Sequence, residues 1–273
     1  MTASNPTTAI RSFGPSAVGD RFIGVRAIAR KDLAAWAHSL RPWVILTVTG
    51  LFMTLSAANA AITAFIIDTL PAGAAAPQPL PMDPLQNLAT AASAQIFAFA
   101  AIFASMGILT GERERGTLAW VATKPVARGA IWLSAWGVGS AVVIAVAVLV
   151  PFAATVALVA VLYGTVSPLA IAAMAMGMAA SVALFMAVGL AASTVTTSQA
   201  AVAAIGFAVL FVPQILAGLL PVDIMPFLPT SIAHWALASA AGIDAGFVTP
   251  IAWAVGMAAL IGLSTRQMGR LEL

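Results

Sequence analysis

The sequence predicts an all-α integral membrane protein with six transmembrane helices, an N-terminal amphipathic interfacial helix and both termini cytoplasmic. Hydrophobic residues make up 62% of the chain and charged residues only 8%, whereas roughly a quarter of a soluble domain is charged. No charged side chain occurs from Gly129 to Val222, and a stretch that long without charge has nothing to face water. Several membrane spans account for it.

All twelve Lys and Arg residues fall in three short regions. These are the head (Arg11, Arg21, Arg26, Arg30, Lys31, Arg41), one internal loop (Arg113, Arg115, Lys124, Arg128) and the tail (Arg266, Arg270). Cations next to membrane spans are retained on the cytoplasmic side, so each region is predicted to be cytoplasmic. The basic balance of the chain fits anionic lipid headgroups and not nucleic acid.

Six apolar runs are long enough to cross the bilayer, which takes about 20 residues each. They are Trp43–Ile67, Ala89–Leu109, Ile131–Val161, Ala170–Ala192, Gln199–Leu220 and Thr249–Ser264, of which the third is the longest and the last the shortest. With a cytoplasmic N-terminus, six spans return the internal loop and the tail to the cytoplasm. The three outer segments (68–88, 162–169 and 221–248) then hold four Asp and no Lys or Arg. Five or seven spans would place Arg266 and Arg270 outside.

The head divides into two parts before the transmembrane domain, which is residues 43–273. Residues 1–20 form a polar tail without an apolar signal region, so the first span is expected to act as an uncleaved signal anchor. Residues 21–42 predict an amphipathic elbow helix on the membrane surface, because apolar side chains recur there at three- and four-residue steps. The apolar stripe is Phe22, Val25, Ala29, Leu33 and Trp36; the elbow also carries Arg26, Arg30, Lys31, Asp32 and, just before the first span, Arg41.

Two of the outer segments differ in composition. The first carries several prolines and predicts extended backbone without a folded domain: Pro71, Pro77, Pro79, Pro81 and Pro84. Segment 221–248 predicts a short interfacial helix over Ser231–Ala241, with Ser231 as its N-terminal cap and Trp235 as an interfacial anchor. A plain loop is the alternative.

The internal cytoplasmic loop, residues 111–129, has the most informative local sequence. It combines alternating charges, a glycine break, a short apolar helix candidate and a turn ended by proline: Glu112-Arg113-Glu114-Arg115, Gly116, Thr117–Ala122 and Thr123-Lys124-Pro125. The alternative is a basic flank that only orients the protein, and composition alone favours it. Orientation needs only cations, however, because Glu contributes little to it. The two Glu residues favour a polar docking surface.

This loop resembles the cytoplasmic loop after the second span in ABC-2 type transporter permeases, where a Glu precedes a Gly-Thr pair and a Pro-x-x-Arg follows. The matching positions are Glu112 or Glu114, Gly116, Thr117, Pro125 and Arg128. The head Ala29-Arg30-Lys31-Asp32-Leu33 and the tail Arg270-Leu271-Glu272-Leu273 are also similar to that family. Many members carry a Lys several residues after the Arg, where this chain has Ile131–Ala135.

The resemblance implies a six-span permease of the inner cell membrane that works as a homodimer, with a separate ABC ATPase subunit docked beneath each half. ATP and Mg would then be bound by that partner, and no cofactor by this chain. The resemblance further implies that Glu112–Arg128 couples to the ATPase, that the head forms the elbow, and that transport is export.

Two absences bear on the source of energy. The chain lacks a G-x-x-x-x-G-K-[ST] phosphate loop, so it cannot hold ATP by that mechanism. Ion-coupled carriers place ionisable residues within their spans, and the six predicted spans contain none. Both absences favour a partner ATPase over a secondary carrier. An ATP-independent carrier or channel, and a non-transporting membrane assembly subunit, are the alternatives.

No catalytic residue and no metal site is predicted. The chain has no Cys, which excludes disulfides and Cys-ligated metals. Met174, Met176 and Met178 cannot converge on copper, because residues two apart on a helix point to different faces.

Small residues within the spans permit close helix approach, at Gly107-x-x-x-Gly111, Gly137-x-Gly139 and Gly177-x-x-x-Ser181. Gln95 and Gln214 are the polar groups deepest in apolar runs, and each is expected to hydrogen-bond a neighbouring helix, with substrate contact as the alternative. Pro213 and Gly218 predict a kink beside Gln214, and Pro151 predicts one in the third span. An uncharged interior suits a lipophilic or amphipathic substrate.

Overall fold

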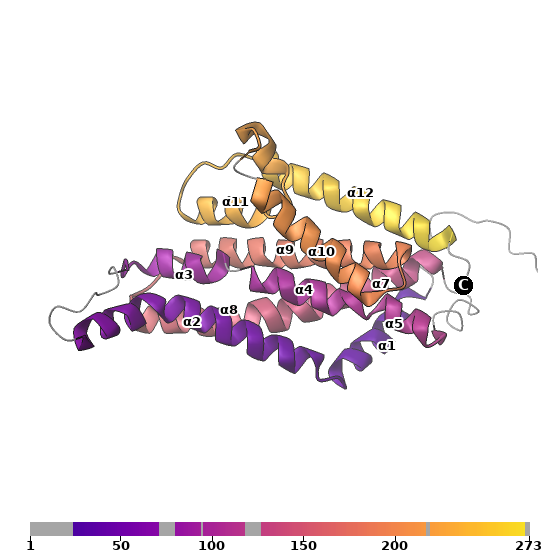
Figure 1. Cartoon of the computed structure of the whole chain (residues 1–273), viewed down its shortest axis with the longest axis horizontal. Helices are drawn as coiled ribbons and strands as arrows, with labels where there is room; N and C mark the ends of the chain where they lie inside the picture. The colour runs from indigo at the N-terminus through magenta and orange to yellow at the C-terminus, as the bar shows by residue number, and fades with distance from the viewer. Residues whose placement is uncertain (1–23, 71–79, 94, 118–126, 217–218, 271–273) are drawn as a thin grey trace, which may run out of the picture.

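The computed structural model describes residues 24–70, 80–93, 95–117, 127–216 and 219–270 (Figure 1). It is 84% helical and has no strand within those residues, which confirms the predicted all-α class. Within the same residues, six helical segments are long and apolar enough to cross a membrane, as predicted. They are Arg41–Thr69 (α2), Pro84–Glu114 (α3 to α5), Arg128–Leu162 (α7, η2 and α8), Pro168–Val195 (α9), Gln199–Leu216 (α10) and Val248–Arg270 (α12).

The helices lie side by side along the long axis of the molecule, with α9 at the centre (Figure 1). α9 contacts α4, α7, α10, α11 and α12, while α2 packs against α8 on one side of it. Because successive spans alternate in direction, the elbow helix α1 (Val25–Ala37), α5, the start of α7 and the end of α12 lie at one end of the bundle (right in Figure 1). We call it the basic end, because the described Lys and Arg residues gather there, and the opposite one the far end.

The third span is the longest, as predicted, and it changes helix type before Pro151. α7 (Arg128–Val143) continues as a π-helical segment, η2 (Ile144–Leu149), and then as α8 (Val150–Leu162). Every fourth residue along it is buried: Ala135, Gly139, Val143, Ala147, Pro151, Thr155 and Val159. In a straight α-helix that stripe would rotate by about 200° between Gly139 and Val159. The additional residue of a π turn removes about half of this rotation, so η2 keeps the stripe turned toward the bundle along more of the span. The kink predicted at Pro151 stays a prediction.

The second span is divided into three helices, which was not predicted. They are α3 (Pro84–Ser93), α4 (Ile96–Met106) and α5 (Leu109–Glu114). α3 begins before the predicted Ala89, because Asp83 Oδ2 accepts a hydrogen bond of 2.7 Å from the Gln86 amide and Pro84 occupies the first helical turn. Pro71, Pro77 and Pro79 lie outside the described residues.

α5 lies in what was predicted to be the start of the cytoplasmic loop. Its residues Leu109 and Thr110 are buried, so packing extends the helix past the apolar run. Glu112 and Glu114 are consequently placed on a helix and not in a loop.

The last two spans differ from the prediction in length. α10 ends at Leu216 instead of Leu220, and residues 217–218, including Gly218, lie outside the described residues. α12 continues past the predicted Ser264 to Arg270, because Met268 is buried and extends the packed face. The prediction that the last span is the shortest is wrong, since α10 has 18 residues and α12 has 23.

The far end contains the short helix predicted in segment 221–248. A 3-10 segment, η3 (Val222–Phe227), precedes α11 (Ser231–Ala240). Ser231 is not its cap, which corrects the prediction: its hydroxyl instead donates to the carbonyl oxygens of Pro226 (2.8 Å) and Leu228 (2.7 Å) in the preceding turn. Trp235 Nε1 donates to the Gly246 carbonyl oxygen at 2.7 Å, which ties α11 to the segment before α12.

Glycines allow helices to approach closely, but at only some of the predicted positions. A Cβ at Gly177 of α9 would lie 2.4 Å from Ala236 Cβ of α11, and one at Gly139 would lie 2.5 Å from Met186 Cε. Three of the predicted glycines do not mark a close approach of two helices, because a Cβ there would meet only an arginine side chain or nothing within 4 Å: Gly107, Gly111 and Gly137.

The closest approach involves a glycine that sequence reasoning missed. A Cβ at Gly189 of α9 would lie 1.8 Å from Ser105 Oγ and 2.6 Å from Ser105 Cβ on α4. Such distances are far inside van der Waals contact, so α4 can pack at this point only against a residue without a side chain.

Gly189→Ala is expected to destabilise the protein by about 1–3 kcal/mol, because the new methyl group overlaps Ser105 and the close-packed helices must separate. Ser105→Gly in the same chain removes the overlapping atoms and should restore most of the loss. Thermal unfolding of the purified chain in detergent measures both effects. Gly262→Ala, at a glycine with nothing within 4 Å, is the control and should not destabilise. Wild-type stability of Gly189→Ala would contradict the close approach.

Candidate functional site

The elbow helix α1 packs against α7 at the basic end. Its buried side chains are Ile28 and Trp36, each 7% exposed. The predicted apolar stripe is only partly correct: Leu33 is 54% exposed, and Phe22 lies outside the described residues. The difference arises because one face of α1 packs on protein, which leaves Leu33 on a face that can meet lipid. Arg26 and Arg30, the cations predicted to lie outside the stripe, are exposed.

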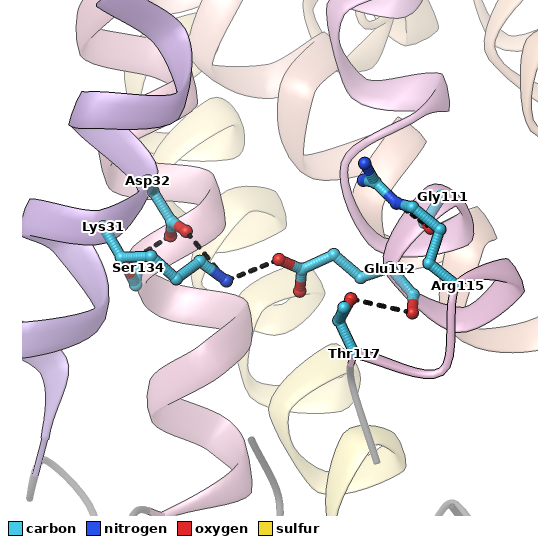
Figure 2. A network of polar contacts seen from close by, with 7 residues as sticks. All are labelled: Lys31, Asp32, Gly111, Glu112, Arg115, Thr117 and Ser134. Carbon is cyan, nitrogen blue, oxygen red and sulfur yellow. Dashed lines mark hydrogen bonds and ion pairs between the residues drawn. The ribbon is translucent and has the colours of Figure 1, made fainter. Parts of the chain in front are cut away.

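Two charged side chains of α1 tie it to other helices (Figure 2). Lys31 Nζ lies 2.5 Å from Glu112 Oε1 on α5 and 3.6 Å from Asp32 Oδ1. Asp32 Oδ2 accepts a hydrogen bond of 2.8 Å from Ser134 Oγ on α7. The side chains of Asp32 and Glu112 are 16% and 17% exposed. The elbow is therefore joined to the second and third spans by largely buried carboxylates.

Burial and ion pairing act on the pKa values of this cluster in opposite directions. Burial raises the pKa of Asp32 above its ordinary value, although the hydrogen bond from Ser134 and the charge of Lys31 oppose the rise. Burial tends to lower the pKa of Lys31, but its contacts with Glu112 and Asp32 outweigh burial and raise that pKa. Lys31 consequently stays charged at neutral pH, while ionisation of Asp32 costs the fold free energy.

The next two charges on α5 reach two further helices. Arg113 Nη1 donates to the Ser193 carbonyl oxygen at 2.9 Å, at the C-terminal end of α9. A cation there satisfies a carbonyl that no helical amide reaches and complements the helix dipole. Glu114 Oε2 lies 3.5 Å from Gln199 Nε2 at the start of α10. Together with Glu112, these side chains connect α5 to α1, α9 and α10.

The turn after α5 is closed by local contacts (Figure 2). Arg115 Nε donates to the Gly111 carbonyl oxygen at 2.9 Å, and Thr117 Oγ1 donates to the Glu112 carbonyl oxygen at 3.1 Å. Gly116 has φ of +69°, a left-handed conformation that costs other residues about 1 kcal/mol or more. This glycine lets the chain reverse at the end of α5.

The remaining predicted coupling residues also lie at the basic end, as far as the structure describes them. Residues 114–117 are exposed and form the part of this turn that a partner can reach. Arg128 begins α7, and its Nη1 lies 3.5 Å from the Gly269 carbonyl oxygen near the end of α12. Pro125 lies outside the described residues.

Gln95 and Gln214, predicted separately to bond a neighbouring helix, bond each other. Gln214 Nε2 donates to Gln95 Oε1 at 2.6 Å and to the Leu210 carbonyl oxygen at 2.7 Å. Gln95 precedes α4, and Gln214 follows Pro213 inside α10, so the bond joins the second and fifth spans. A mainly apolar cavity of about 500 Å³ opens beside Gln214 at the far end and includes His234.

Sequence reasoning missed Arg113 and Ser134 as site residues. Arg113 stands between the two predicted Glu residues, and its alternation with them could have indicated that α5 faces more than one neighbour. Ser134 is a small polar residue in an apolar run, and nothing in its sequence context distinguishes it.

The described residues contain no group of three or more His, Asp or Glu that could hold a metal. Met174 and Met178 are buried whereas Met176 is 65% exposed, so Met176 points to a different face from the other two and the three thioethers do not converge, as predicted.

Asp32→Asn is expected to be at least as stable as the wild type at neutral pH, because Asn keeps an acceptor for Ser134 and cannot ionise. Since the folded pKa of Asp32 is raised, the folded state binds this proton more tightly than the unfolded chain. Protonation of Asp32 therefore adds to the free energy of unfolding as the pH falls through the raised pKa of the folded state. The gain is complete once the pH is below 3.8, the ordinary pKa of Asp. Asp32→Asn should lack this gain.

Thermal unfolding in detergent across that pH range measures the difference. Asp223→Asn, at an exposed Asp of η3, is the control and should keep the wild-type pH dependence. An unchanged dependence in Asp32→Asn would contradict the assignment to this carboxyl group.

Comparison with known proteins adds one finding to this geometry. The sequence model of a family described as ABC-2 family transporter protein matches residues 26–261. The match runs from α1 into α12 and so includes the elbow helix and α5. No curated protein matches the chain. Because the match covers most of the chain and confirms the resemblance found in its loop, the chain belongs to the ABC-2 family of transporter proteins and is a multi-pass membrane permease.

Proposed function

We propose that this chain is the membrane-spanning subunit of an ATP-driven exporter, that two copies work together, and that the basic end receives force from a separate ATPase subunit. The observation that carries this proposal is the set of contacts made by three consecutive charged residues of α5. Glu112, Arg113 and Glu114 contact α1, α9 and α10 respectively. A push on α5 is therefore applied to three helices at once.

The contacts of α9 support transmission of that push along the bundle. α9 spans from Arg113 at the basic end to α11 at the far end, where Gly177 packs against Ala236. Close-packed helices move as rigid bodies and transmit displacement over their length. α10 carries the second connection, from Gln199 at the basic end to Gln214 beside the far-end cavity.

The partner would supply the energy. ATP and Mg would be held by the ATPase, since this chain has no phosphate loop. Its contact surface would include exposed residues 114–117 and Arg128. Docking at this end would require the basic end to lie in the cytoplasm and the protein in the inner cell membrane, and the retention of cations on the cytoplasmic side supports this orientation.

The far-end cavity supports a lipophilic or amphipathic substrate. Its lining comes from η3, α11 and the flanking ends of α10 and α12, with Gln214 and His234 among mainly apolar side chains. Pockets with an apolar wall and few polar groups hold ligands that are themselves mainly apolar. The bond between Gln95 and Gln214 lies beside this cavity, so a helix displacement that breaks it would change access to the cavity.

Lys31→Glu and Glu112→Lys are each expected to lower stimulation of the partner ATPase by about fivefold or more, in the range of couplings between distant sites. Each variant places like charges together, which separates the elbow from α5. The double variant restores an ion pair with reversed polarity and should recover most of the stimulation. The measurement is ATP hydrolysis by the reconstituted pair.

Arg30→Glu is the matched control, because Arg30 is an exposed cation of the same helix outside the Lys31 cluster. Full stimulation in both folded single variants would remove Lys31 and Glu112 from the coupling site. Co-purification of this chain with an ATPase that carries a phosphate loop supports the whole proposal. Uphill flux driven by this chain alone in liposomes would contradict it and favour an ATP-independent carrier.

A further inference from the structure

The basic end contains a cavity beside the contact between Lys31 and Glu112. It has a volume of about 250 Å³ and lies between α1, the start of α2 and the junction of α4 with α5. The charged side chains that line it are three cations and two carboxylates: Lys31, Arg41, Arg115, Asp32 and Glu112. Its lining is therefore positive by one charge at neutral pH.

The carboxylates of this cavity do not neutralise its arginines. Lys31 is the cation that pairs with Glu112 and Asp32. Within the part of the chain that the structure describes, neither Arg41 nor Arg115 forms an ion pair. Two guanidinium groups facing one cavity without a counter-charge favour an anion between them.

The backbone leaves room for both guanidinium groups. Gly107 lies beneath the Arg41 side chain, since a Cβ there would be 2.9 Å from one guanidinium nitrogen. Arg115 is folded back on the Gly111 carbonyl oxygen, to which its Nε donates at 2.9 Å (Figure 2). The Arg115 side chain is also part of the lining of the cavity.

A second cavity adjoins the first and differs from it in character. It has a volume of about 400 Å³ and shares Arg41 and Gly107 with the charged cavity. Apart from Gln199 of α10, its other lining side chains come from α2, α4 and the segments next to them and are apolar: Leu40, Val44, Ile45, Phe103, Ala104 and Met106. A net-positive pocket and an apolar groove that meet at one arginine match a ligand with an anionic head and an apolar tail.

The depth of the two cavities fits such a ligand in the bilayer. Arg41 is the first residue of the first span, and Gly107 lies near the end of the second. Arginines at the ends of spans lie at headgroup level, and basic pockets between transmembrane helices on the cytoplasmic side hold anionic headgroups. The apolar cavity lies beside the first turns of α2 and so at the depth of the upper acyl chain.

We propose that the basic end binds one anionic phospholipid, with its phosphate between Arg41 and Arg115 and an acyl chain in the groove beside Val44 and Phe103. The lipid would brace the elbow against α2 and α5. This proposal rests on the membrane-spanning fold and on the two cavities, and it is independent of the partner ATPase.

The test uses the full-length purified chain in detergent, with phosphatidylglycerol as the anionic probe and phosphatidylcholine of the same acyl chains as its neutral counterpart. Native mass spectrometry gives the occupancy and affinity of each lipid. Phosphatidylglycerol is expected to bind about tenfold tighter than phosphatidylcholine, and the double variant Arg41→Gln with Arg115→Gln should abolish that preference. Arg30→Gln removes an exposed cation outside the cavity and should leave the preference unchanged.

Two further arms separate a lipid from other anions. Val44→Trp fills the apolar groove and should weaken the binding of phosphatidylglycerol about as much as the arginine variants do. Val48→Trp, one turn further along α2 and outside the groove, is its matched control and should bind like the wild type. Arg115→Gln alone, at an exposed position, keeps the test valid if Arg41→Gln does not fold.

Several outcomes would overturn the proposal. Equal affinity for the two lipids, or unchanged phosphatidylglycerol affinity in Arg115→Gln, would remove the phosphate site. Competition by inorganic phosphate, together with wild-type binding in Val44→Trp, would assign the cavity to a free anion. If the arginine variants no longer bind the partner ATPase but bind phosphatidylglycerol normally, the cavity would instead be assigned to an acidic segment of that partner.

Discussion

Hydrocarbon offers neither water nor counter-ions, so a chain that crosses it repeatedly must satisfy its polar groups within the protein and keep its charges at the ends. Polar side chains inside the spans bond mainly to their own helices, as Thr155 does to Pro151 and Ser181 to Gly177. The charged groups that connect different helices gather at the basic end, where Lys31 meets Glu112 and Arg113 meets Ser193. The position of the proposed coupling site follows from this solvent constraint.

Within the bilayer, packing replaces the hydrophobic effect as the force between helices. α9 can lie at the centre because its small residues let neighbours come close, at Gly189 toward α4 and at Gly177 toward α11. Helices that interlock in this way have little freedom to slide past one another. The same close packing that stabilises the bundle therefore makes it stiff enough to carry a displacement from one end to the other.

The class of protein and the number of spans could be predicted because each follows from composition along the chain. Contacts between distant positions could not. Lys31 and Glu112 are far apart in sequence, and nothing in the local sequence indicates that one binds the other. Gln95 and Gln214 were each predicted to bond a neighbouring helix, but the sequence did not indicate that they bond each other. Gly189 was missed even though Ser193 follows it at the four-residue spacing that drew attention to Gly177 and Ser181, because that spacing does not say which neighbouring helix approaches. Helix ends were misplaced where packing, as at Met268, outlasts the apolar run.

The π-helical segment η2 bears on how the third span tolerates a change of length. A π turn holds one residue more than an α turn, so α7 and α8 keep the mutual orientation of an uninterrupted helix that is one residue shorter. Loss of one residue from Ile144–Leu149 would leave both flanking faces aligned, whereas the same deletion at Val156 would swing everything beyond it by about 100°.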